Sequence, residues 1–160
     1  MTGTPQKSAT PQKAGGAGKP SQSQIEIWTG YTHYLLAADG LLRFTDALCK
    51  KKLDEAAFKK VSAVIGAAHI ALQGVNEQLI KGIENMKEGK APDFTLEPSP
   101  IPDWSPDAEA SVFAGAWEAI KAVLERMMDA TSPSSAMGVA LAGVINHGDD
   151  IVKALEPAFG

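Results

Sequence analysis

The sequence has little of the chemistry that metal and redox sites need. It contains one cysteine, Cys49, and three histidines in 160 residues. One cysteine cannot form a disulfide within the chain, and no Cys-x-x-Cys-His haem attachment sequence is present. Glu-x-x-His, the pair that di-iron bundles use, is also absent. We therefore expect no cofactor, and the cysteine usage favours a reducing, cytoplasmic compartment.

Long apolar runs and a surplus of basic residues are missing as well. The longest weakly polar stretches, residues 61–72 and 136–145, are too short to cross a bilayer, so we expect no stable membrane insertion. The chain has 15 basic and 19 acidic residues. A nucleic-acid-binding domain normally shows a basic surplus, so nucleic acid is not an expected partner.

Residues 1–22 lack almost every large apolar side chain, and the sequence Thr-Pro-Gln-Lys occurs in them twice. Such a composition cannot bury enough surface to offset the entropy of ordering, which predicts a disordered tail. The repeat is typical of a flexible extension. Three alternatives stay open: a Thr-Pro-x-Lys phosphorylation site, an unstructured export signal without a cleaved signal peptide, and a weak electrostatic tether.

Residues 23–90 have the pattern of a helical hairpin. Ser23 and Glu26 match a capping box, which predicts the start of the first helix. Lys50–Lys52 suit its carboxyl end, and Asp54 is the expected cap of the second helix, which Gly89 ends. Apolar residues recur every three or four positions along the second helix: Phe58, Val61, Val64, Ile65, Ala68, Leu72, Val75, Leu79, Ile83 and Met86.

Residues 91–105 form a predicted connector that is rich in proline. Proline at this density disfavours both helix and central strand. An extended segment of this length reaches about 45 Å, which is the length of a long helix. The third helix therefore need not run antiparallel to the second.

A second hairpin is predicted over residues 106–158. Ser105 and Pro106 are expected to open its first helix, Ser132 and Pro133 its second, and Pro157 to end it. Two hairpins joined by a crossover predict an all-α, four-helix bundle that occupies residues 23–160 as one domain.

Candidate ligands for a small molecule or haem are few. His69 and His147 lie at the borders of apolar stripes and could approach each other across the bundle, although partly exposed structural histidines are the simpler interpretation. Aromatic and methionine side chains on the buried faces could line such a site, but core packing explains them equally well. They are Tyr31, Tyr34, Met86, Met127 and Met137.

No set of residues predicts catalysis. The cluster at residues 146–150 contains Asp149 and Asp150, but adjacent helical residues point about 100° apart, so a solvated helix face is expected rather than a cation site. Cys49 follows the apolar stripe of its helix, where a buried and inert thiol is usual. We expect a protein that is not an enzyme.

Small and surplus apolar residues favour an interaction protein. Glycines make the last helix thin, which permits close helix packing within the chain or self-association. Several apolar residues fall outside the main stripes and would mark a contact surface if exposed. The candidate interaction residues are Leu36, Phe44, Trp117, Leu124, Met128, Gly138 and Gly143. The expected function is binding to a protein partner or to further copies of the chain; a small-molecule carrier and an exported effector are the alternatives.

Overall fold

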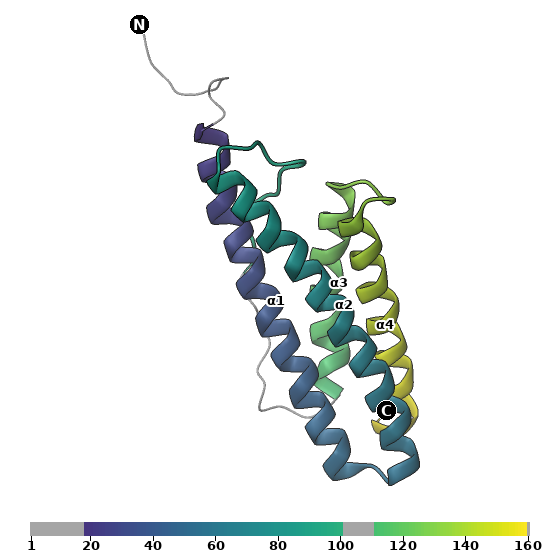
Figure 1. Ribbon diagram of the computed structural model, residues 1–160. Coiled ribbons are helices and arrows are strands. Elements are labelled where there is room, and N and C mark those ends of the chain that lie inside the picture. Colours follow the sequence, from purple (N-terminus) through teal and green to yellow (C-terminus); the bar gives the residue numbers. More distant parts are fainter. Residues whose placement is uncertain (1–17, 101–110, 160) are drawn as a thin grey trace, which may run out of the picture.

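The computed structural model describes residues 18–100 and 111–159, and in these ranges it contains four α-helices and no strand (Figure 1). The predicted all-α, four-helix architecture is confirmed. The helices are α1 (Gly18–Lys52), α2 (Glu55–Lys87), α3 (Ser111–Asp129) and α4 (Ala136–Phe159). Within the described ranges, none of them is both long and apolar enough to traverse a bilayer.

The order of the helices around the bundle follows from their packing. Helix α2 packs against α1 and α4, and α3 packs against α4 and more lightly against α1. Figure 1 shows α1 and α4 running toward the lower end of the bundle, and α2 and α3 running toward the upper end. Each packed pair is therefore antiparallel, whereas α2 and α3, which are consecutive along the chain, run in the same direction.

The first hairpin has the turn that the sequence predicts. A carboxylate oxygen of Asp54 accepts a hydrogen bond from the backbone N–H of Ala57 at 2.8 Å, so Asp54 is the N-cap of α2. Gly89 follows α2 with a φ of 93°, a left-handed conformation that glycine adopts without steric cost. Both predicted ends of α2 are confirmed.

The predicted start of α1 is wrong. The helix begins at Gly18, so Ser23 lies inside it and is not its cap. Pro20 falls within the first turn, where a missing N–H removes no intrahelical hydrogen bond. Residues 18–22 of the predicted tail are therefore helical, and the Thr-Pro-Gln-Lys repeat lies outside the described residues.

The second hairpin differs from the prediction at both ends of α4. The hydroxyl of Ser135, three residues after the expected cap Ser132, accepts the N–H of Gly138 at 3.0 Å. Helix α4 also continues past Pro157 to Phe159, because a proline in the last turn removes only one terminal hydrogen bond. The expected start of the third helix at Ser105 and Pro106 lies outside the described residues.

The described part of the connector runs beside α1. The side-chain amide of Gln24 bonds the backbone of Leu96 twice: it donates to the carbonyl at 3.1 Å and accepts from the N–H at 2.7 Å. Further along, the hydroxyl of Ser99 reaches Gly30, where a β-carbon would overlap it. Residues 96–99 therefore follow α1 in its own direction; residues 101–105 of the predicted connector lie outside the described ranges.

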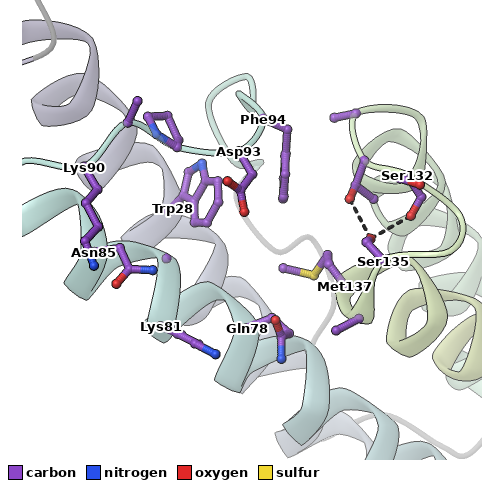
Figure 2. Close-up of a pocket in the computed structure, with 16 residues that line it drawn as sticks. Trp28, Gln78, Lys81, Asn85, Lys90, Asp93, Phe94, Ser132, Ser135 and Met137 are labelled. Carbon is purple, nitrogen blue, oxygen red and sulfur yellow. Dashed lines mark hydrogen bonds between the residues drawn. The ribbon is translucent and has the colours of Figure 1, made fainter.

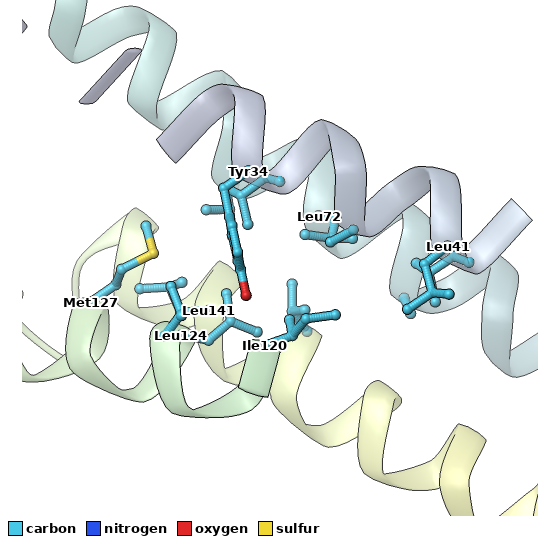
Figure 3. Close-up of a cluster of buried hydrophobic side chains, with 14 of the residues drawn as sticks. Tyr34, Leu41, Leu72, Ile120, Leu124, Met127 and Leu141 are labelled. Carbon is cyan, nitrogen blue, oxygen red and sulfur yellow. The ribbon is translucent and has the colours of Figure 1, made fainter. Parts of the chain in front are cut away.

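The core lies between the four helices and consists of the predicted apolar stripes. Figure 3 shows Tyr34 of α1 reaching toward α3 and α4, among side chains that come from every helix. The labelled members of this cluster are all buried: Tyr34, Leu41, Leu72, Ile120, Leu124, Met127 and Leu141. Burial on this scale explains how α2 is helical despite Gly66, Gly74 and Gly82.

Candidate functional site

A cavity of about 480 Å³ lies at the end of the bundle where α2 ends and α4 begins (Figure 2). Its walls come from Trp28 of α1, the last turns of α2, the connector that follows Gly89, and the α3–α4 turn with the start of α4. This volume falls in the range of small-molecule sites, which are few in any protein. We call it the end cavity.

Trp28 forms one wall of the end cavity and is held from three sides. Its indole Nε1 donates to Oε1 of Gln24 at 3.0 Å. Its ring packs on Phe94 of the connector with centroids 4.8 Å apart, and it lies against the backbone of α2 at Gly82. Figure 2 shows Met137 of α4 across the cavity from this aromatic pair. These contacts give the cavity a fixed apolar wall.

A polar row lies on the α2 wall. Gln78, Lys81 and Asn85 line the cavity and are spaced three and four residues apart, which places them on one face of the helix. Their side chains make no hydrogen bond or ion pair with any other described residue. The donors and acceptors of this row are therefore available to a bound molecule.

The hydroxyl groups on the opposite wall form hydrogen bonds within the protein. Ser135 donates to the carbonyl of Ser132 at 2.6 Å and accepts from Gly138, and its oxygen also lies 3.1 Å from the hydroxyl of Thr131. These bonds hold the α3–α4 turn in shape. The end cavity thus combines an apolar wall with a single row of uncommitted polar groups.

Large apolar side chains are exposed on α2 and on the two helices that pack against it. Among the described residues, the large hydrophobic side chains that are exposed belong to α1, α2 and α4, and α3 contributes none. They are Leu36 (59% exposed), Ile70 (68%), Ile80 (44%) and Val139 (62%). Because α2 packs between α1 and α4, we call these four residues the α2 face.

Three of the predicted interaction residues, Trp117, Leu124 and Gly138, are buried and not available to a partner. Trp117 and Leu124 are buried, so the expected exposed edge on α3 is wrong. The ring of Trp117 lies over Gly148 of α4, where a β-carbon would overlap it, and its Nε1 donates to Asp149 at 2.8 Å. Leu36 is exposed, whereas Phe44 and Met128 are half-buried.

The acidic cluster at residues 146–150 also differs from the expectation of a solvated face. Both carboxylate oxygens of Asp149 accept hydrogen bonds from Nζ of Lys121, at 3.1 and 3.0 Å. Burial alone would raise the pKa of Asp149, but the hydrogen bonds from Trp117 and Lys121 outweigh it and lower that pKa. Asp149 therefore joins α4 to α3. Gly148, which directly precedes Asp149, is the sequence feature that could have indicated this close approach of α3 and α4.

The small residues of α4 pack against other parts of the same chain. Gly138 is buried against the backbone of Ser132 and Pro133. A β-carbon on Gly143 would lie 3.6 Å from Ala71, and one on Gly74 would lie 3.7 Å from Ala140, which are ordinary contact distances. Close packing of α4 against α2 and its own turn thus accounts for these small residues, the first of the two predicted explanations.

The histidines face different surroundings. Nδ1 of His69 lies 2.5 Å from a carboxylate oxygen of Asp39 on α1, and Arg43 bonds the other oxygen at 3.1 Å. His147 is half-buried on α4. In the described ranges, no three His, Cys, Asp or Glu side chains gather as a metal site would require.

The aromatic and methionine residues that were predicted to line a ligand site are all buried in the core. Of these five residues, only Met137 borders the end cavity.

Cys49 is fully buried, as its position in the apolar stripe predicts. Burial, and to a smaller extent the carboxylate of Asp46, raises the pKa of its thiol to about 11. The thiolate, which is the reactive form, is therefore scarce at neutral pH.

Comparison with known protein families, with characterised proteins and with solved structures yields no significant match.

Proposed function

We propose that this protein works without catalysis by associating with further copies of itself through the α2 face. The observation that carries the proposal is the exposure of two large apolar side chains on α2, Ile70 and Ile80, together with one on each helix that packs against α2, Leu36 on α1 and Val139 on α4. Singly scattered exposed apolar side chains are ordinary on a protein surface, whereas a contiguous patch of them is typical of an interaction surface.

The backbone around Ile70 suits a second helix. Ile70 is the most exposed large apolar side chain described, and Gly66 lies one turn before it. No atom lies within 4 Å of the position that a β-carbon on Gly66 would take. A helix of a second copy can therefore approach α2 closely there, with its own Ile70 available for the reciprocal contact that a twofold dimer needs.

The proposal is tested by the mass of the full chain in solution. Analytical ultracentrifugation over a wide concentration range should show a concentration-dependent oligomer for the wild type. Ile70→Glu places a charge at the centre of the α2 face and should shift the chain to monomer. Loss of a hot-spot residue weakens association by about 2 kcal/mol or more, which is about a thirtyfold increase in Kd.

The matched control is Ala122→Glu, which adds the same charge at an exposed position of α3, away from the α2 face. This variant should associate like the wild type. A wild-type chain that stays monomeric at all concentrations, or an Ile70→Glu variant that associates as strongly as the control, would overturn the proposal.

A further inference from the structure

The end cavity is separate from the α2 face. None of the four exposed apolar residues of that face lines the cavity, so an inference about the cavity does not depend on self-association. Its walls are also built from side chains with defined contacts, because Trp28 is fixed by Gln24 and Phe94 and the α3–α4 turn is fixed by its serines.

The apolar wall is suited to a flat ring. Trp28, Phe94 and Met137 are the large apolar side chains that border the cavity. Aromatic side chains attract rings by offset or edge-to-face contact, and the methionine sulfur also favours contact with aromatic rings. In Figure 2 the side chains of Phe94 and Met137 point toward the same space from the connector and from α4.

The polar row selects the charge of the ligand. The rim carries Asp93 and Lys90, whose Nζ lies 3.8 Å from a carboxylate oxygen of Glu88, and the α2 wall carries the ammonium group of Lys81. Gln78 and Asn85 flank Lys81 on the same helical face and can donate through their amide N–H groups. An ammonium between two amides matches a carboxylate, because hydrogen bonds to an ionised acceptor are stronger than those between neutral groups.

From these two walls we infer that the end cavity is a binding site for a small aromatic carboxylate. The ring lies against Trp28, Phe94 and Met137, and the carboxylate meets Lys81 between Gln78 and Asn85. The inferred ligand is a planar molecule with one anionic group, of a size that a cavity of about 480 Å³ accommodates.

The test uses three probes that share one ring and differ in charge: naphthalene-2-carboxylate, naphthalene-2-methanol and 2-naphthylmethylamine. Titration calorimetry on the full chain should give the carboxylate the lowest Kd, at least about tenfold below that of the amine, since hydrogen bonds to an ionised acceptor are stronger than those between neutral groups. Lys81→Gln should remove this preference. Lys87→Gln, an exposed lysine of α2 that does not line the cavity, should keep it.

A variant that fills the cavity tests its location. Ala136 is exposed at the first position of α4 and borders the cavity, so Ala136→Trp should occupy the space and abolish binding while the circular dichroism of the helices is unchanged. Absence of carboxylate binding at millimolar concentration, equal affinity for all three probes, or undiminished binding to the folded Ala136→Trp variant would each overturn the inference.

Discussion

The indole ring of Trp28 occupies the space that a β-carbon on residue 82 would take, so Gly82 is what allows α1 to pack this closely on α2 at the end cavity. The same relationship recurs between Trp117 and Gly148, where α3 meets α4. In each hairpin, a tryptophan ring of the first helix thus packs on a glycine of the second helix. In both cases the indole N–H donates to a nearby side chain, which is Gln24 for Trp28 and Asp149 for Trp117.

Gly82→Ala should therefore destabilise the bundle even though alanine favours helix. Overpacking a filled site costs about 1–3 kcal/mol, which exceeds the gain of about 0.5–1 kcal/mol from replacing a helical glycine. Urea unfolding followed by circular dichroism would measure the difference. Gly40→Ala is the matched control, because the space at Gly40 is open and the substitution should raise stability. A Gly82→Ala variant as stable as the Gly40→Ala variant would contradict this account.

Gln24→Ala should loosen the connector. The substitution leaves the N–H groups of Leu96 and Trp28 without their acceptor in a buried setting, at a cost of about 1–3 kcal/mol. Amide hydrogen exchange at Leu96 should accelerate, and global stability should fall. The exposed neighbour Gln22 is the control, since its replacement by alanine should change stability by less than about 0.5 kcal/mol. Unchanged exchange at Leu96 in Gln24→Ala would show that the two hydrogen bonds contribute little.

Asp149 should make stability depend on acid pH. Its pKa is lower in the folded chain than in the unfolded chain, so its contribution is complete above the unfolded pKa and is lost as pH falls through the folded value, which means below about pH 4. Asp149→Asn can still accept from Trp117 but has no carboxylate to protonate. Its unfolding free energy should fall less steeply than that of the wild type below pH 4. Asp150→Asn, an exposed neighbour, should follow the wild-type curve; identical slopes for all three would refute the assignment.

Cys49 should resist alkylation in the native chain. With its pKa raised to about 11 and its side chain fully buried, iodoacetamide at pH 8 should modify it only when the bundle opens. Mass spectrometry of a time course should show slow labelling that becomes rapid in urea. Stoichiometric labelling of the native chain within minutes would mean that this region of α1 is accessible.

The parts of the fold that sequence predicted correctly depend on local signals. Asp54 and Gly89 mark the ends of α2 because each acts through its own backbone neighbours, and the apolar stripe between them needs only helical periodicity. The prediction of a helix cap at Ser23 was wrong because the capping-box sequence is also compatible with a helix interior, and Pro20 could be accommodated in an earlier first turn.

The sites were less predictable because they depend on tertiary contacts. Trp117 falls at the edge of its stripe on a helical projection, and its ring is packed against Gly148 of α4, a contact between helices. The end cavity joins α2, the connector and the α3–α4 turn, whose relative positions no local pattern encodes. The four-residue spacing of Gln24 and Trp28 was the one local signal at this site, and it predicts a side-chain pair without indicating the connector between them.

The first turn of α1 and the last turn of α4 lie at opposite ends of the bundle (Figure 1). A pulling force applied to these two turns acts parallel to the helix axes, along a span of roughly 50 Å that corresponds to the 35 residues of α1. Such a load shears every helix interface at once, whereas termini on the same end would let the helices peel apart one by one. Tension along this line is therefore expected to meet resistance from shear between packed helices rather than from peeling.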